Sequence, residues 1–543
     1  MIEIDDHATI GDTLFRAAAR YGANALLAVP ANAARAYHPQ GFEISFEAAA
    51  AAVRVLMQRY ADAGYGSGHR VGLLLENRPE HLLHKLALNA LGVCCVPINP
   101  DYRSREMARL IDHSRVDLVV VLASRHALLR AALAEAAHAP GVMVFEEFQH
   151  AVPAPLRAGD GVPCTSDSPA SILYTSGTTG QPKGCVLSHR YELAAGMAYA
   201  TCGGLATLRE GVERIYNPLP LYHVNASILS FYCVLLTGNC QVQTDRFQPS
   251  RFLTEVRESR ATVVHYLGVV IPMLLNQPAG PGDLNHGVRF GFGAGVEPQL
   301  HAVFEARFGF PLLELWGMTE MVRMLVDNMP PRQVGTRAFG RAVPGVEARV
   351  VDEAGEEQPD GTPGELVIRH SEATPRKDFF TGYLDDPAAT EDAWRGGWFH
   401  TGDVVQRDGT GMLHFVDRRK NIIRRSGENI AAAEVEALLQ SHPLVAQVAV
   451  LGVPDEVREE EVLACIVLKQ PVDGEGPRLA VARLLFDFCH TNLAYYKAPG
   501  YVWITDIIPM TGTHKVQKHA LFAQGSDPRC APGMIDLCSL KKR

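Results

Sequence analysis

The stretch 174-YTSGTTGQPKG-184 combines glycines, threonines, a serine and one lysine directly after the apolar run Ile172-Leu173-Tyr174. The run predicts a short buried strand, so the polar residues should lie on the loop that leaves this strand. Glycines let successive backbone N–H groups converge on one point, while hydroxyl groups and Lys183 add donors and charge. The stretch therefore predicts a loop that binds phosphate.

Two other interpretations of this loop are weaker. A Walker A loop requires G-x-x-x-x-G-K-[ST], and the segment from Gly177 to Gly184 departs from both the spacing and the ending, which disfavours a kinase or a P-loop ATPase. A surface turn can share the composition. The ordered run S-G-T-T-G-x-P-K-G is much more specific than composition, so the phosphate-binding interpretation is preferred.

Length and composition limit the class of protein. A chain of 543 residues exceeds one ordinary core, which favours two or more domains. Hydrophobic residues at 47% and charged residues at 20% are typical of a soluble globular protein. The net charge of -9 comes from 60 acids and 51 bases spread along the chain, which argues against a nucleic-acid partner.

Targeting signals and cysteine usage point to the cytoplasm. The N-terminus MIEIDDHATIGDTLF has no apolar signal region, and the apolar window 222–240 is interrupted by His223 and Asn225, so we expect no membrane span. The eleven cysteines form no CxxC pair and are expected to be reduced.

Strand-like runs at 71–75 and 118–122 alternate with helical stretches such as 125–139, which predicts an α/β sheet with covering helices. From about residue 340, Pro and Gly clusters separate short segments and predict a β-rich subdomain. We therefore expect a large α/β N-terminal domain over residues 1–419, with the β-rich subdomain at about 340–419. A small mobile α+β C-terminal domain is expected over residues 420–543.

Further motifs identify a family. The phosphate-loop stretch resembles the signature of the acyl-adenylate-forming enzymes, the superfamily of acyl-CoA synthetases, peptide-synthetase adenylation domains and luciferases. Six other segments resemble its remaining signatures in the right order: 216-YNPLPLYHVNA-226, 293-GAGVEP-298, 316-WGMTE-320, 398-WFHTGD-403, 417-DRRKNIIRRSGENI-430 and 509-PMTGTHKVQK-518. The resemblance covers nearly the whole chain.

The resemblance implies a two-step reaction with ATP, Mg²⁺ and a thiol. A carboxylate attacks the α-phosphate of ATP and releases pyrophosphate, and the thiol then attacks the acyl-AMP. Cationic groups are needed because the first step brings an anion onto a polyanion. By resemblance the phosphates are held by Thr175, Ser176, Gly177, Thr178, Thr179, Gly180 and Lys183, with Thr319 as a further phosphate contact and Glu320 as a ligand of Mg²⁺.

The same resemblance assigns the rest of the nucleotide site. Adenine is expected against Gly293, Ala294 and Gly295 and the Trp316-Gly317-Met318 segment, where Trp316 replaces the tyrosine more usual in the family. Asp403 is expected to hold the ribose hydroxyls with help from Arg418. His223 is assigned a gating or positioning role between the acyl pocket and the thiol channel, although a lone His in an apolar stretch is more often structural.

The C-terminal motifs imply a hinge. Lys420 occupies the pivot position, Lys515 is expected to face ATP in the first step, and Gly427 is expected to line the coenzyme A channel in the second. His514 stands where the family usually has Gly before the catalytic lysine. Without the resemblance, the basic run 417–425 would be interpreted as a solvated face.

The acyl pocket is expected to include Asn225, Val269, Gly291 and Arg323. The segments expected to line the pocket are 222–232, 265–270, 291–295 and 321–325. Most of their residues are apolar or small, which favours a hydrocarbon body on the acid. Arg323 has two interpretations: a pair with a structural acid, or a ligand for a polar or anionic group of the acyl chain.

The segment 417–430 most resembles the crotonobetaine/carnitine-CoA ligase-like group, so coenzyme A is the favoured acceptor and a small carboxylic acid the substrate. Two alternatives stay open: a stand-alone ligase that loads a carrier protein, and a catalytically silent nucleotide-binding regulator. A homodimer is one option for the oligomeric state, which the sequence does not decide.

Overall fold

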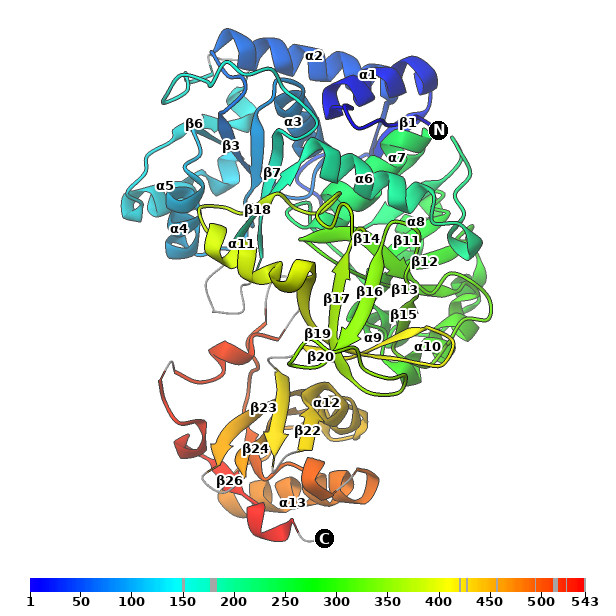
Figure 1. The fold of residues 1–543 in the computed structure, drawn as a ribbon, viewed down its shortest axis with the longest axis vertical. Coiled ribbons are helices and arrows are strands. Elements are labelled where there is room, and N and C mark those ends of the chain that lie inside the picture. Colours follow the sequence, from blue (N-terminus) through cyan, green and yellow to red (C-terminus); the bar gives the residue numbers. More distant parts are fainter. Residues whose placement is uncertain are drawn as a thin grey trace. The chain divides into compact units, whose positions relative to one another are not determined.

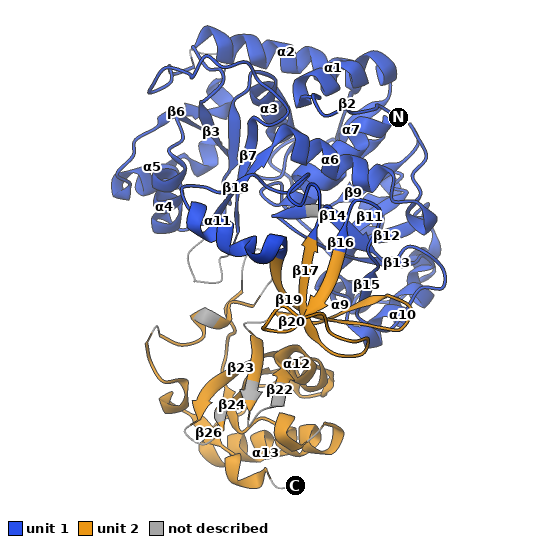
Figure 2. Ribbon diagram, in the orientation of Figure 1, with its two compact units in different colours: residues 1–347, 369–399 blue, residues 348–368, 400–543 orange. Residues whose placement is uncertain are grey.

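The computed structural model describes residues 1–148, 152–175, 183–418, 421–425, 428–455, 458–493, 495–510, 516–523 and 525–541. The chain forms two compact units (Figure 2). The first comprises residues 1–347 and 369–399, and the second residues 348–368 and 400–543. The predicted boundary at Lys420 falls outside the described residues and stays a prediction.

The first unit contains a large mostly parallel sheet with the strand order β14-β13-β12-β11-β9-β10-β1-β2 (Figure 1). Strands β13, β12, β11, β9, β10 and β1 run parallel, and β14 and β2 are antiparallel edges. In this order the strands are β14 (Met321–Val326), β13 (Leu312–Met318), β12 (Phe290–Ala294), β11 (Val263–Leu267), β9 (Arg214–Asn217), β10 (Cys240–Gln243), β1 (Ala25–Val29) and β2 (Phe42–Ser45).

A second sheet of the same unit has the order β18-β8-β7-β4-β3-β5-β6. Its strands are β18 (Gly382–Tyr383), β8 (Lys183–Ser188), β7 (Pro169–Thr175), β4 (Cys94–Pro97), β3 (Arg70–Leu74), β5 (Leu118–Val121) and β6 (Gly141–Val144). The apolar runs predicted as strands form β3 and β5, which are almost fully buried because the parallel sheet is covered on both faces.

Several helices of this unit begin where a polar side chain caps them. Thr9, Ser45 and Ser188 each accept a hydrogen bond from the backbone N–H three residues later, which satisfies one of the free donors at a helix start. The helices are α1 (Ile10–Tyr21), α2 (Phe46–Asp62), α3 (Pro79–Ala90), α4 (Ser104–Ser114), α5 (Ala123–Glu135), α6 (His189–Ala200), α7 (Phe231–Thr237), α8 (Phe252–Glu258), α9 (Val270–Leu275), α10 (Pro298–Phe308) and α11 (Pro387–Ala393), with a π-helix η3 (Asn225–Ser230) before α7.

The second unit contains two sheets. The strands β20 (Leu413–Arg418), β19 (Phe399–Arg407), β17 (Gly364–Arg369) and β16 (Glu347–Val351) are neighbours in one sheet. The other has β22 (Glu428–Ala431), β21 (Ile422–Arg425), β24 (Glu459–Leu468), β25 (Tyr501–Ile504) and β26 (Met534–Asp536), with β23 (Val445–Asp455) paired to β24. Helices α12 (Ala432–Ser441) and α13 (Glu475–Asn492) add apolar side chains to its core.

These elements confirm the predicted α/β N-terminal part and the smaller α+β C-terminal part. The strands of the predicted β-rich region are present, although those from residue 348 onward belong mainly to the second compact unit. Across the described ranges, no helix is long and apolar enough to cross a membrane.

Candidate functional site

Several of the predicted nucleotide and acyl residues lie at the carboxyl ends of neighbouring strands of the large sheet. Strands β9, β11, β12 and β13 are parallel neighbours, so their carboxyl ends lie side by side. Ligands in open α/β sheets bind outside the carboxyl ends of the strands. Val269 follows β11, the loop at Gly295 follows β12, and Glu320 follows β13. The topology therefore brings to one edge residues that are far apart in the sequence.

The phosphate loop joins the antiparallel strands β7 and β8. Thr175 and Lys183 are directly opposite one another where the two strands of this hairpin meet the loop. The predicted strand before the loop is confirmed, because Ile172 and Leu173 are buried in β7. The predicted phosphate contacts Ser176, Gly177, Thr178, Thr179 and Gly180 lie outside the described residues.

Thr319 and Glu320 form the two-residue connection between β13 and β14, where Met318 pairs with Met321. The Tyr191 hydroxyl donates to the Thr319 carbonyl oxygen at 2.6 Å and fixes this turn. Glu320 is only 6% exposed, and its Oε1 accepts a hydrogen bond of 2.9 Å from the Tyr383 hydroxyl. The turn thus holds a carboxylate in a defined position at the sheet edge.

Tyr383 is a site residue that the sequence analysis missed. Strand β18 pairs it with Cys185 of β8, and the Lys183 ammonium lies 4.6 Å from its ring centroid. Tyr383 therefore contacts both Lys183 and Glu320, the predicted phosphate and magnesium residues. Burial and the Glu320 carboxylate raise the pKa of the Tyr383 hydroxyl, which keeps it a hydrogen-bond donor.

The loop at Gly293–Gly295, predicted to contact adenine and called the adenine loop below, depends on close approach of two backbone segments. A Cβ on Gly268 would lie 1.8 Å from the Gly295 carbonyl oxygen, and a Cβ on Gly293 would lie 2.2 Å from the Tyr266 carbonyl oxygen. Gly295 also has a φ of +88°, a conformation that favours glycine. These three glycines allow the ends of β11 and β12 to lie against each other.

Glu314 of β13 holds this loop from below and was also missed. Its Oε2 accepts hydrogen bonds from the backbone N–H groups of Gly295 at 2.9 Å and Val296 at 3.2 Å, and its Oε1 accepts one of 2.7 Å from the Tyr266 hydroxyl. Burial raises the pKa of Glu314 to about 7, although these three donors oppose the shift. A single acid within the apolar run 312-LLELW-316 was the signal that could have identified it.

The segment Trp316-Gly317-Met318 ends β13 beside the loop. Only 6% of Trp316 is exposed, and its ring lies 6.1 Å from that of Phe339 between centroids. Stacking of Trp316 on adenine stays a prediction.

The acyl-pocket candidates differ in their surroundings. Asn225 and Val269 are partly exposed, whereas Gly291 is buried and a Cβ there would lie 2.7 Å from Leu312 Cδ2. Arg323 forms an ion pair of 2.7 Å with Asp378, which is 5% exposed in its side chain. This pair favours the structural interpretation of Arg323.

His223 lies in the turn that leads into η3. Its ring centroid is 4.6 Å from that of Tyr222, and its carbonyl oxygen accepts a hydrogen bond from the Ser227 hydroxyl. Its predicted gating role is not tested by these contacts.

In the second unit, Asp403 and Arg418 are directly paired across β19 and β20. Arg418 Nε lies 2.6 Å from Asp403 Oδ1, and the Asp403 side chain is 2% exposed. The arginine thus positions the carboxylate predicted to hold the ribose. Lys420, Gly427, His514 and Lys515 lie outside the described residues.

The described side chains fit a magnesium ion that arrives with ATP. Within these residues no group of three or more His, Cys, Asp or Glu side chains could hold a metal ion. Mg²⁺ commonly takes one or two protein carboxylates and completes its shell with phosphate oxygens and water. The single carboxylate of Glu320 matches this arrangement.

Comparisons with known proteins agree with these features. The family model "AMP-binding enzyme" matches residues 15–383, and the model "AMP-binding enzyme C-terminal domain" matches residues 434–515. Crotonobetaine/carnitine–CoA ligase of Citrobacter koseri is 32% identical over 84% of this chain and 89% of its own length. Sulfoacetate–CoA ligase of Cupriavidus necator is 32% identical over 88% of this chain and 92% of its own.

Solved structures show the same fold. ATP-bound MatB from Rhodopseudomonas palustris aligns with a TM-score of 0.78 at 25% identity over 95% of this chain and 98% of that chain. The predicted resemblance is confirmed, and the chain belongs to the AMP-binding enzyme family.

Proposed function

We propose that the protein is an ATP-dependent carboxylic acid:CoA ligase that forms acyl-AMP and pyrophosphate and then acyl-CoA and AMP. The observation that carries the proposal is that Tyr383 contacts both Lys183 of the β7–β8 hairpin and Glu320 of the β13–β14 turn, while the Gly293–Gly295 loop ends the neighbouring strand β12. Two relatives that cover most of the chain are CoA ligases for other small acids, which supports this activity.

The first step requires that a carboxylate approach the α-phosphate of ATP. The phosphate loop and Lys183 would hold the β- and γ-phosphates, and Lys515 would lie between carboxylate and α-phosphate and stabilise the charge that develops there. Mg²⁺ bound through Glu320 would neutralise phosphate charge. Tyr383 donates to Glu320 and its ring lies beside the Lys183 ammonium, so it would separate the two charged side chains and hold each in position.

The second step requires that the thiol reach the acyl-AMP. Asp403, positioned by Arg418, would hold the ribose through two hydroxyl contacts. The C-terminal domain would turn about Lys420 so that Gly427 lines the channel for the pantetheine arm. A glycine there would allow close backbone approach.

The test is a pair of half-reaction assays over a panel of short, branched, aromatic, steroid-like and betaine acids. ATP–pyrophosphate exchange that depends on one of these acids, followed by CoA-dependent AMP release, would support the ligase. Exchange without CoA-dependent release, together with acyl transfer to a holo-carrier protein, would support the carrier-loading alternative. No exchange with any acid, while ATP still binds, would support the silent regulator.

Variants in the C-terminal part separate the two steps. Lys515→Ala should abolish exchange and spare thioester formation from supplied acyl-AMP, because the lysine lowers only the first barrier. Gly427→Leu should do the converse. Lys469→Ala, at an exposed lysine of the same unit, is the matched control and should alter neither step.

A further inference from the structure

A buried network of hydrogen bonds links Asn217 to Asn225 and Ser230. One backbone N–H shows which atom of the Asn217 amide is the oxygen, and this fixes donor and acceptor through the network. The Leu219 N–H donates to Asn217 Oδ1 at 3.0 Å, so this amide oxygen is an acceptor. Asn217 Nδ2 is therefore the donor to Asn225 Oδ1 at 3.0 Å and to Ser230 Oγ at 2.9 Å. The amide of Asn225 is thus oriented with its oxygen toward Asn217.

A second donor holds the same oxygen. His265 is fully buried, and burial lowers its pKa to about 3, so the ring is neutral and carries one N–H. Its Nδ1 lies 2.8 Å from Asn225 Oδ1, which cannot donate, so Nδ1 carries the proton. His265 Nε2 then accepts from the Tyr199 hydroxyl at 3.0 Å, which completes a consistent arrangement.

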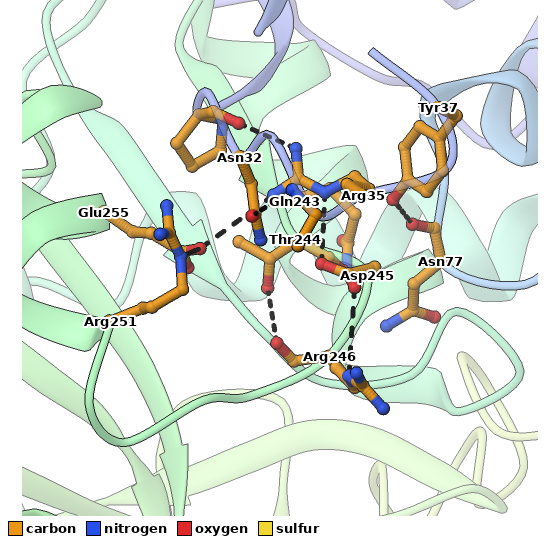
Figure 3. A network of polar contacts seen from close by, with 12 residues as sticks. Asn32, Arg35, Tyr37, Asn77, Gln243, Thr244, Asp245, Arg246, Arg251 and Glu255 are labelled. Carbon is orange, nitrogen blue, oxygen red and sulfur yellow. Dashed lines mark hydrogen bonds and ion pairs between the residues drawn. The ribbon is translucent and has the colours of Figure 1, made fainter. Parts of the chain in front are cut away.

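The hydrogen-bond network continues from Ser230 to Gln241 and Gln243, and each of these side chains finds a partner. The Ser230 hydroxyl donates to Gln241 Oε1 at 2.8 Å, and Gln241 Nε2 donates to Gln243 Oε1 at 2.9 Å and to the Ala226 carbonyl oxygen at 3.0 Å. Gln243 Nε2 donates to the Leu219 carbonyl oxygen at 3.1 Å. Figure 3 shows Gln243 beside Thr244 in the polar network around Arg35. This satisfied network makes the orientation of Asn225 rigid.

The nitrogen of the Asn225 amide has no acceptor among the described residues. The hydrogen bonds from Asn217 and His265 both fall on Oδ1, and no described group accepts a hydrogen bond from Nδ2. Asn225 is partly exposed and begins the π-helix η3, a kind of helix that is frequent at functional sites. Its partner His265 lies in β11, whose last residue pairs with Ala294 beside the adenine loop.

We infer that Asn225 Nδ2 is a specificity-determining donor, and that the acid this enzyme activates carries an oxygen acceptor on its acyl chain. A hydroxyl, carbonyl, second carboxylate or sulfonate oxygen would each fit two amide N–H donors. The inference rests on the proposed function and narrows its substrate class. Arg323 does not compete for this group, because Asp378 already pairs with it.

The test compares acids in matched pairs of equal chain length, one with an oxygen acceptor on the chain and one without. For the wild-type enzyme we expect kcat/KM to be about 10- to 100-fold higher for the acceptor-bearing member of at least one pair, as for a lost polar contact of ordinary strength. Equal kcat/KM values across all pairs, or a preference for the plain acids, would overturn the inference. No activity with any acid would instead refute the proposed function.

Asn225→Asp is the sharpest variant because it keeps an oxygen facing Asn217 and His265 and replaces only the outward NH₂. We expect it to lose the preference for acceptor-bearing acids, with a 10- to 100-fold fall in kcat/KM for them and little change for plain acids. Asn276→Asp makes the same change at an exposed position and should preserve the preference. A uniform loss with all acids in a variant that stays folded by circular dichroism would assign Asn225 a structural role.

Discussion

Two buried glutamates of the first unit have different partners. Glu192 of α6 is fully buried, forms an ion pair with the equally buried Lys85 of α3, and accepts a hydrogen bond from the Ser171 hydroxyl. Glu314 of β13 is 7% exposed, and its donors among the described residues are two backbone N–H groups and the Tyr266 hydroxyl. One carboxylate is balanced by a full positive charge, and the other is held by dipoles.

The difference follows from the position of each residue. Glu192 lies where α3, α6 and β7 meet, and its ion pair and hydrogen bond join these three elements. Glu314 lies next to the adenine loop and accepts a hydrogen bond from its backbone. The loop glycines bring two backbone segments so close together that a cationic side chain would not fit between them. Because dipoles offset burial only in part, Glu314 changes charge near neutral pH, and the loop above it should respond.

Removing the cation of the first pair should have the largest effect. Lys85→Met leaves Glu192 as an uncompensated buried charge, which should lower the free energy of unfolding by about 3–5 kcal/mol. Urea denaturation at pH 7 measures the loss. The double variant Lys85→Met/Glu192→Gln removes the stranded charge and should recover most of the stability.

The matched control is an exposed pair of the same unit, Arg376 with Glu391. Arg376→Met should lower the free energy of unfolding far less than Lys85→Met, because solvent screens such pairs. If Lys85→Met proves as mild as Arg376→Met, the buried pair does not stabilise the fold in the way described.

Glu314→Gln should have the next largest effect, which should develop as the pH rises from about 4.5 to about 7 and be complete above neutral pH. The folded-state pKa of about 7 lies above the ordinary value of 4.5, so between these values the folded state binds more protons than the unfolded state. Wild-type stability should therefore fall as pH rises from about 5 to about 8, by about 3 kcal/mol relative to Glu314→Gln. Denaturation of both proteins across this range measures the difference.

The glutamine can keep the loop in place, since its amide oxygen can accept from Gly295 and Val296 while the Tyr266 hydroxyl turns toward the Leu313 carbonyl oxygen, 3.2 Å away. A constant difference in stability from pH 5 to pH 8 would show that Glu314 does not titrate in this range.

Much of the fold follows from local sequence patterns. Runs such as Leu118–Val121 are apolar and β-branched, and they form buried parallel strands as expected. The expected α+β domain includes α12, whose apolar residues recur at helical spacing. The assignment of residues 348–368 to the second unit depends on strand pairing between distant segments, which local patterns do not reveal.

The site was predictable where residues belong to a motif and unpredictable where they only meet in space. Glu320 belongs to the motif WGMTE and lies in the turn between β13 and β14. Tyr383, its hydrogen-bond donor, lies 63 residues away in a short edge strand, and nothing in its neighbourhood indicates the contact. The orientation of the Asn225 amide likewise depends on His265, 40 residues further along the chain.

A smaller effect is expected when only the hydroxyl donor of Glu192 is removed. Ser171→Ala leaves the Lys85 pair in place but takes one hydrogen bond from a buried carboxylate, which should cost about 1–3 kcal/mol. Urea denaturation should show the same loss of stability at pH 6 and at pH 8, in contrast to Glu314→Gln.

The control is Ser441→Ala, at an exposed serine, which should change stability by less than about 0.5 kcal/mol. A Ser171→Ala loss as small as that would mean that the hydroxyl contributes nothing to the pair.

Tyr266→Phe should have the smallest effect on stability and the most specific effect on pH dependence. The variant removes one donor from Glu314, which should cost about 1 kcal/mol at pH 8. Because that donor favours the charged form, its loss should raise the pKa of Glu314 further, so the fall in stability should shift to higher pH. Denaturation from pH 5 to pH 9, with the double variant Tyr266→Phe/Glu314→Gln as reference, isolates this shift.

Tyr216→Phe is the matched control, because the buried Tyr216 hydroxyl donates to Glu255 instead, and this variant should leave the pH midpoint unchanged. An unchanged midpoint in Tyr266→Phe would mean that backbone N–H groups alone set the charge of Glu314.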